Sequence, residues 1–200
     1  MTLNKGKIIV VEGIDKAGKY TQSRLLIDAL KLSGRRRTMM SFPDYTTPIG
    51  QEIKAFFDGK RNYAIELTHM LLSANRWEKK NEIESMIEKD NIIIMNRYYQ
   101  SNIVYGVSHD LDLEWLLNLD KGLPKEDIVI ILRVNPNTSY QRTRQYKEWY
   151  NVMPKKLLTK VHKNYHILAK RFNWKVVDGE KTTEQVHNEI MNIVKDILKV

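Results

Sequence analysis

A glycine-rich turn after a short apolar run is the feature of this sequence that most limits how the chain can fold. Residues 7–13, KIIVVEG, contain the continuous β-branched run IIVV, which is typical of a strand buried on both faces of a sheet. Gly13, Gly18 and Lys19 then fit the spacing G-x-x-x-x-G-K of a phosphate-binding loop, and a helical pattern follows them. A strand, a glycine loop and a helix in this order predict an α/β domain that binds nucleotide phosphates.

The predicted loop carries the groups that hold phosphate. Its glycines allow a tight turn that points backbone N–H groups at phosphate oxygens. The N-terminus of the following helix adds partial positive charge, and Lys19 is expected to neutralise the β- and γ-phosphates of a nucleotide. The sequence therefore predicts ATP-phosphate contacts from Gly13, Lys16, Ala17, Gly18, Lys19, Tyr20 and Thr21.

The last position of the loop motif departs from the pattern. A Ser or Thr there supplies a hydroxyl to Mg²⁺, and this chain has Tyr20 instead. The tyrosine hydroxyl lies beyond a ring and cannot take the same place, while the neighbouring Thr21 points about 100° away around the helix. Because Mg²⁺ readily keeps several waters, we expect it to be held through the nucleotide phosphates and water.

Strand-like and helix-like segments alternate along the rest of the chain. Further strands are predicted at residues 38–42, 91–96, 127–134 and 174–178. Helices are predicted after the glycine loop as far as Gly34, from Pro48, from about Ala64 to Glu88, and after a capping box formed by Thr182 and Gln185. This alternation predicts a parallel sheet covered by helices on both faces, with right-handed crossovers.

Length and composition fit a single domain spanning residues 1–200. Residues 140–156 are rich in charged and aromatic side chains without a clear period, so they are predicted to be a mobile insertion or lid. The chain is 42% hydrophobic, has no cysteine and starts with an apolar run too short for a signal peptide or membrane span, so we expect a cytoplasmic protein without a membrane partner.

The net charge of +9 favours anionic partners, namely nucleotides, phosphates or nucleic acid. The one compact basic cluster, Arg35–Arg37, is either a solvated loop after a helix or a nucleic-acid patch. No aromatic side chains are interleaved with it, so nothing indicates a stacking surface for single strands. Nucleic acid is therefore not the partner that we expect.

Six segments together resemble one family. They are VEGIDKAGKYTQSRLL, FPDYTTPIG, LLSANRWE, NRYYQS, GLPKEDIVIIL and NWKVVD, and they occur in the order found in thymidylate kinases. The chain resembles the eukaryotic and poxviral branch, which has a basic residue inside the loop, here Lys16. The resemblance covers nearly the whole chain and is weakest over residues 135–160.

This resemblance implies a fold, an activity and an assembly. The fold would be the three-layer P-loop nucleoside monophosphate kinase fold, with a parallel five-stranded sheet and a lid. The activity would be transfer of the γ-phosphoryl group of ATP to dTMP, with Mg²⁺, to give dTDP. The assembly would be a homodimer formed through helices that flank the sheet.

The resemblance also implies roles for individual residues. Asp15 would lie near the acceptor sugar and the reacting phosphates, Arg97 would bind the acceptor phosphate, and Tyr105 would crowd a 2′-hydroxyl. Arg76 would hydrogen-bond the acceptor base. Substrate contacts are expected from Asp15, Phe42, Tyr45, Leu72, Arg76, Arg97, Ser101 and Tyr105. Candidate catalytic residues are Asp15, Lys19, Arg97, Arg142 and Arg144, although the last two could equally form a solvated helix face.

Several positions depart from the family pattern. Tyr45 replaces an arginine that binds the acceptor phosphate, Leu72 replaces a stacking phenylalanine, and Asn96 replaces an aspartate near the metal. Leu157 and Leu158 stand opposite a Phe-Gln pair that frames the base. Two hypotheses follow: an active thymidylate kinase, or a catalytically impaired relative that binds a nucleotide or a partner protein. A nucleic-acid-binding protein is a third hypothesis, resting on charge alone.

Overall fold

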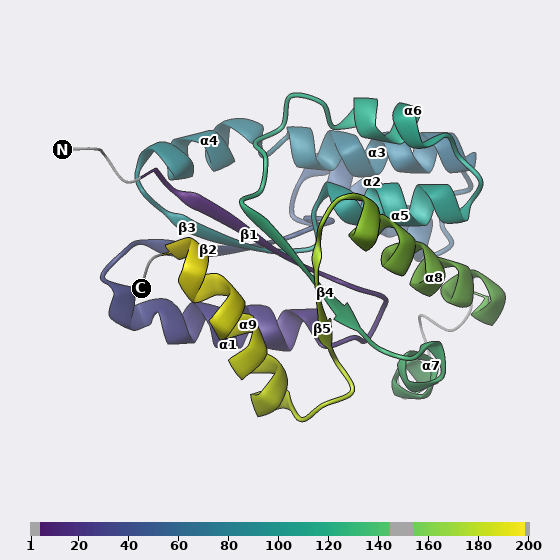
Figure 1. The fold of residues 1–200 in the computed structure, drawn as a ribbon. Helices are drawn as coiled ribbons and strands as arrows, with labels where there is room; N and C mark the ends of the chain where they lie inside the picture. Colours follow the sequence, from purple (N-terminus) through teal and green to yellow (C-terminus); the bar gives the residue numbers. More distant parts are fainter. Residues whose placement is uncertain (1–4, 145–153, 199–200) are drawn as a thin grey trace.

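The chain folds around one parallel sheet, shown by a computed structural model that describes residues 5–144 and 154–198, without the side chains of residues 32, 33, 143 and 144 (Figure 1). The strands pair in the order β2-β3-β1-β4-β5, all parallel. Their bounds are β1 (Lys7–Glu12), β2 (Arg37–Ser41), β3 (Ile92–Asn96), β4 (Ile128–Arg133) and β5 (Lys175–Asp178). All five predicted strands and the predicted fold class are confirmed.

The middle of the sheet is buried because its strands are apolar on both faces. Residues 8–12 of β1, 92–95 of β3 and 128–132 of β4 are buried. In the sheet, β1 lies between β3 and β4, with Val11 beside Asn96 and Glu12 beside Ile131. The carboxyl ends of these central strands therefore meet at one edge, where open parallel sheets bind their ligands.

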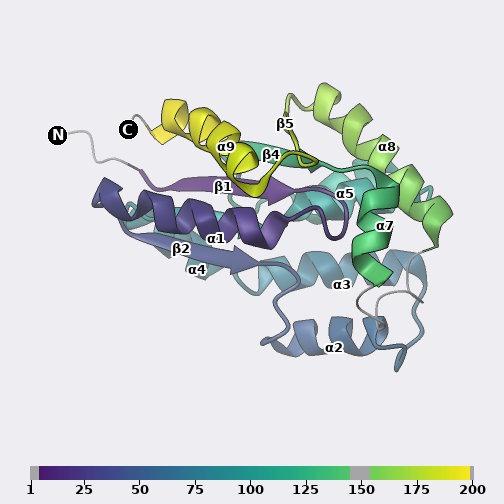
Figure 2. The same cartoon turned by 90° about the horizontal axis from the view of Figure 1, so that it is seen from below.

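Helices cover both faces of the sheet, which gives the three predicted layers (Figures 1 and 2). Helices α1 and α9 pack together on one face, while α4, α5 and α8 cover the other, with α2, α3 and α6 outside them. Their bounds are α1 (Lys19–Ala29), α2 (Pro48–Phe57), α3 (Ile65–Trp77), α4 (Lys80–Glu88), α5 (Tyr99–Ser108), α6 (Leu113–Leu119), α7 (Pro136–Arg144), α8 (Lys155–Arg171) and α9 (Thr183–Leu198).

Local signals for the ends of helices are confirmed. Gly34 takes a left-handed conformation, φ 69°, after the 3₁₀ turn (Leu30–Ser33) that ends the first helical segment. At the start of α9, the Thr182 amide donates to Gln185 Oε1 at 3.1 Å and the Gln185 amide donates to Thr182 Oγ1 at 3.3 Å, which is the predicted capping box. Within residues 5–144 and 154–198, no helix is both long enough and apolar enough to cross a bilayer.

The prediction of one helix from Ala64 to Glu88 is wrong. The chain forms α3 and α4 with a break at Glu78 and Lys79. The side chains at the break are held from outside the helix: Glu78 accepts from the Ile49 amide at 3.4 Å, and Lys79 pairs with Asp44 at 3.2 Å. No Gly or Pro marks this break, so the sequence pattern alone predicted continuity.

Helices α5 and α6 were not predicted, and the predicted lid is partly regular. Helix α5 buries polar as well as apolar side chains, for example Gln100 and Asn102, so it lacks the polar face that makes a helix visible in a sequence. Within residues 140–156, the first five residues end α7 and residues 155 and 156 begin α8. Residues 145–153 lie outside the described part of the chain, and motion of this region stays a prediction.

Candidate active site

A cavity of about 1130 Å³ opens at the carboxyl edge of the sheet. Its wall is formed by the glycine loop and the start of α1, the segment after β2, one face of α3, the start of α5, and parts of α7 and α8. The predicted site residues that line it are Asp15, Lys16, Ala17, Gly18, Lys19, Tyr20, Thr21, Phe42, Tyr45, Leu72, Arg76, Asn96, Arg97, Ser101, Tyr105, Arg142, Leu157 and Leu158. The fold thus brings together residues from most of the length of the chain.

The glycine loop connects β1 to α1 and has the backbone conformation that its residues allow. Gly13 (φ 141°), Lys16 (φ 57°) and Gly18 (φ 95°) have positive φ. Gly13 lies at the base of the loop, where a Cβ atom would be 2.6 Å from the Leu132 carbonyl oxygen, so only glycine fits. The loop therefore turns tightly against β4 and leads directly into the N-terminus of α1.

Lys19 is held inside the loop. Its Nζ atom donates to the carbonyl oxygens of Gly13 at 3.0 Å and Ile14 at 2.8 Å, and only 7% of the residue is exposed. Burial, followed by the nearby positive charge of Arg97, lowers the pKa of Lys19 to about 7. The ammonium group is thus positioned at the cavity by the backbone, but its charged form is costly until an anion is bound.

Glu12, at the end of β1, is a site-forming residue that the sequence analysis did not identify. The residue is fully buried, and its Oε1 accepts from the amides of Tyr98 and Ser101, both at 3.0 Å. Its Oε2 accepts from the Ser101 hydroxyl at 2.7 Å and from the Tyr165 hydroxyl at 2.8 Å. Glu12 therefore acts as the N-terminal cap of α5 from another element, and it connects α5, α8 and β1 beside the loop.

Arg97 lies between β3 and α5 with a positive φ of 68°. Its Nη2 donates to Asp15 Oδ1, its Nη1 donates to the Ser101 hydroxyl at 2.8 Å, and its guanidinium carbon lies 5.4 Å from the centre of the Tyr105 ring. Four residues predicted to contact the acceptor are thus mutual neighbours. Asp15 and Arg97 neutralise each other, so a bound phosphate would compete with Asp15 for this guanidinium.

Helix α7 packs against the back of the loop. The Ser139 hydroxyl donates to the Asp15 carbonyl at 2.6 Å, and Arg142 Nη1 donates to the Lys16 carbonyl at 3.0 Å. The Arg142 side chain therefore reaches the loop that is expected to hold the donor phosphates. The side chain of Arg144 lies outside the described part of the structure, so its role stays a prediction.

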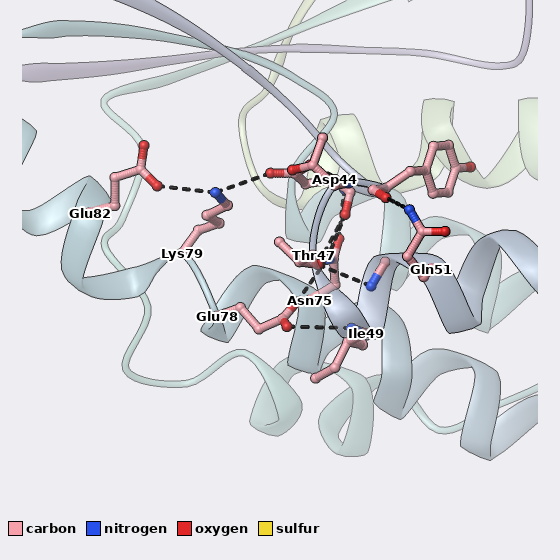
Figure 3. Close-up of polar contacts among 11 residues, drawn as sticks. Asp44, Thr47, Ile49, Gln51, Asn75, Glu78, Lys79 and Glu82 are labelled. Carbon is pink, nitrogen blue, oxygen red and sulfur yellow. Dashed lines mark hydrogen bonds and ion pairs between the residues drawn. The ribbon is translucent and has the colours of Figure 1, made fainter.

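The segment after β2 is anchored to α3 through Asn75 (Figure 3). Asn75 is fully buried; its Oδ1 accepts from the Asp44 amide at 2.7 Å, and its Nδ2 donates to Thr47 Oγ1 at 2.8 Å and to Glu78 Oε2 at 3.0 Å. The Asp44 carboxylate also pairs with Lys79. These contacts place the next residue, Tyr45, at the cavity, and burial raises the pKa of its hydroxyl, so Tyr45 brings a neutral donor and no charge.

Arg76 is fixed by a buried ion pair with Asp120. Its Nε donates to Asp120 Oδ1 at 2.9 Å and its Nη2 to Oδ2 at 2.8 Å, while the side chains of both residues are 3% exposed. Ser73 adds a hydrogen bond to the same carboxylate at 2.8 Å. Arg76 still lines the cavity, and its Nη1 makes no hydrogen bond within the described residues. Asp120 carried no signal in the sequence, because it lies on a loop far along the chain.

The two positions next to the expected metal differ in exposure. Tyr20 is 62% exposed at the start of α1 and lines the cavity. The Nδ2 of Asn96 donates to Ser41 Oγ at 3.2 Å, and its Oδ1 is buried without a hydrogen-bond partner among the described residues. Asn96 therefore presents the one unpaired amide oxygen at the end of β3 beside the loop, as far as the structure is described.

Comparison with known proteins decides the family. The thymidylate kinase family model matches residues 11–190. The chain belongs to the thymidylate kinase family. Thymidylate kinases from Danio rerio and Plasmodium falciparum are 35% and 36% identical to it, over 100% and 98% of this chain and 95% and 91% of their own length. The solved thymidylate kinase structure from Candida albicans superimposes with a TM-score of 0.85 at 28% identity, covering 96% of this chain and 92% of that one.

Residues of the glycine loop and residues of α3 and α5 line the same cavity, and Asp15 of the loop bonds Arg97 directly. The roles of individual residues remain predictions, since what the structure establishes is their positions.

The basic cluster Arg35–Arg37 has structural contacts: Arg35 donates to the Lys5 carbonyl at 3.4 Å and pairs with Asp90.

Proposed function

We propose that this chain transfers the γ-phosphoryl group of ATP to dTMP, giving ADP and dTDP. The observation that carries the proposal is that one cavity contains both Lys19 of the glycine loop and Arg97, a second, partly buried cation that is held by Asp15. Family membership supports the same reaction. In it, an oxygen of the acceptor phosphate attacks the γ-phosphorus as the bond to the bridging oxygen of ADP breaks.

The side chains contribute mainly position and charge. Lys19 would exchange the Gly13 and Ile14 carbonyls for donor phosphate oxygens, and anion binding would favour its charged form. Arg97 would bind the acceptor phosphate, while Asp15, released from it, would lie beside both phosphates. Arg142 would stay against the loop as a further positive group. Such a set of cations suits phosphoryl transfer, where stabilising oxygen charge is the main requirement.

The residues at the loop fit a magnesium ion that arrives with the nucleotide. No group of three or more His, Cys, Asp or Glu side chains able to hold a metal occurs among the described residues. The unpaired Asn96 Oδ1 is a hard oxygen donor of the kind that Mg²⁺ accepts, and the rest of the shell would come from phosphate and water. When bound, Mg²⁺ supplies charge neutralisation on the donor phosphates.

A turnover measurement distinguishes the proposed kinase from a catalytically impaired relative that only binds nucleotide. Purified protein with ATP, Mg²⁺ and dTMP is expected to release ADP well above a Lys19→Ala variant. The double variant Tyr20→Thr with Asn96→Asp restores a hydroxyl and a carboxylate beside the metal, so kcat is expected to rise by about tenfold, the effect of roughly one charge-assisted contact.

The contrary outcome is equally clear. If only the double variant turns over, the natural chain is the impaired relative, and the kinase proposal fails for it. A thermal shift with ADP and with dTMP then reports whether binding persists, because stabilisation grows with ligand concentration relative to the dissociation constant.

We also propose a homodimer that forms through α3. Leu67, Met70 and Trp77 are large apolar side chains on this helix, and each is exposed. Exposed apolar residues gathered on one helix are typical of an interface. Sedimentation equilibrium is expected to give twice the chain mass, and Met70→Glu is expected to weaken self-association at least tenfold. A monomeric natural protein at micromolar concentration would contradict this proposal.

A further inference from the structure

His69 is a buried histidine on the wall of the cavity, and no role has yet been given to it. It lies on α3 with Leu72 and Arg76, at positions i, i+3 and i+7, so the three share one helix face. The residue is 2% exposed and lines the same cavity as Asn102, with which it makes hydrogen bonds. Asn102 follows Ser101 on α5, and Ser101 bonds Arg97, so His69 and Arg97 are both attached to the start of α5.

Asn102 on α5 determines which imidazole nitrogen carries the proton. Its Nδ2 donates to the His69 backbone carbonyl at 3.3 Å, and its Oδ1 lies 2.6 Å from His69 Nδ1. A carbonyl can only accept, so the amide nitrogen must face it and the amide oxygen must face the imidazole. Nδ1 is therefore the N–H of the ring.

The other ring nitrogen is left as an acceptor. Burial lowers the pKa of His69 to about 4, an effect only partly opposed by the hydrogen bond to Asn102, so the imidazole is neutral at physiological pH. With the proton on Nδ1, Nε2 has a free lone pair. Nε2 makes no hydrogen bond to any residue in the described ranges 5–144 and 154–198. Because His69 lines the cavity, this lone pair is available to a hydrogen-bond donor on a ligand.

We propose that His69 Nε2 accepts a hydrogen bond from N3–H of a 2,4-dioxopyrimidine acceptor base, such as thymine or uracil, with Asn102 as the positioning residue. The inference rests on the proposed function and concerns how the base of its acceptor nucleotide is recognised. Thymine and uracil carry a hydrogen on N3, whereas N3 of cytosine carries a lone pair that would face the lone pair of Nε2. Arg76 Nη1 is an available donor for an oxo group on the same side. His69 would thus select for the protonated N3.

Calorimetric binding of dUMP and dCMP to the natural protein and to His69→Phe tests the inference. The natural protein is expected to bind dUMP at least tenfold more tightly than dCMP, since one hydrogen bond and one lone-pair repulsion distinguish them. Phenylalanine keeps an aromatic ring but has no hydrogen-bond acceptor. The ratio of dUMP affinity to dCMP affinity is therefore expected to fall about tenfold. The matched control is His166→Phe on α8, where the histidine is exposed, and it should keep the natural ratio.

A second variant covers the case in which His69→Phe does not fold. N3-methyl-dUMP cannot donate from N3, and its methyl group would meet Nε2, so the natural protein should bind it at least a hundredfold less tightly than dUMP. His69→Ala removes the imidazole and should bring the two affinities within about threefold. An unchanged dUMP-to-dCMP ratio in His69→Phe, or an unchanged N3-methyl penalty in His69→Ala, overturns the inference.

Binding and turnover together separate this inference from the proposed function. Base discrimination that depends on His69, without ADP release, supports the inference and contradicts the kinase proposal. ADP release with a base preference that His69 does not affect supports the kinase and overturns the inference. Failure to bind any of these monophosphates overturns both.

Discussion

Lys19→Ala is expected to lower kcat for dTMP phosphorylation by about a thousandfold. Removal of one preorganised charged donor from a transition state typically costs 10²–10³ in rate, and Lys19 is buried with its ammonium group fixed by two carbonyls of the loop. The measurement is ADP release at saturating ATP and dTMP. Helix α1 and the loop glycines stay in place, so the melting temperature should change little.

The matched control is Lys31→Ala. Lys31 lies at the other end of the same helical segment, and its exposed ion pair with Asp28 at 2.7 Å is of the kind that contributes about 1 kcal/mol or less. Its kcat should match the natural protein. A Lys19→Ala variant that keeps more than a tenth of the natural kcat would show that this lysine does not stabilise the transferring group.

Asp120→Ala is expected to lower the free energy of unfolding by about 3–5 kcal/mol. The change leaves the Arg76 guanidinium, whose side chain is 3% exposed, without its carboxylate, and loss of one partner of a buried pair typically costs that much. It also frees Arg76 from its bidentate position on the cavity wall, so the dTMP KM should rise. Urea unfolding and steady-state kinetics measure the two effects.

Two further variants make this prediction specific. Asp110→Ala removes a similar ion pair, with Lys160 at 2.6 Å, but the Asp110 side chain is 84% exposed, so about 1 kcal/mol or less should be lost. The double variant Arg76→Met with Asp120→Leu replaces both charges by apolar side chains and should recover most of the stability while the dTMP KM stays high. Equal losses of unfolding free energy in Asp110→Ala and Asp120→Ala would contradict the claim that burial makes the Arg76–Asp120 pair the more important one.

Motifs that are local in the sequence predicted the strand, the glycine loop and the helix that follows it. The strand, the loop and the first turn of α1 are continuous in the chain, so the spacing of Gly13, Gly18 and Lys19 already defines the turn. The same holds for the three central strands β1, β3 and β4, whose continuous apolar runs are buried on both faces. Family segments then located Arg76, Arg97 and the α5 residues that line the cavity.

Contacts between distant segments were beyond such reasoning. The single predicted helix is interrupted at Glu78 and Lys79, whose side chains contact Ile49 of α2 and Asp44 after β2, and a pattern of apolar residues contains no information about those contacts. In the same way, nothing in the sequence distinguishes Asn75 from its neighbours, yet its side chain holds the segment that contains Tyr45. Its importance arises from burial and from its partners Thr47 and Asp44, which are 28 and 31 residues away in the chain.

The sequence by itself determined the fold class, the phosphate loop and the family, because each depends on residues whose spacing along the chain sets their geometry. The tertiary structure decided which side chains share charge and protons. Glu12 meets Tyr165 across 153 positions, Arg76 meets Asp120 across 44, and His69 meets Asn102 across 33. Those partners are chosen by how α3, α5 and α8 pack on the sheet. Only there, away from water, do they set the proton positions and charges that a nucleotide would meet.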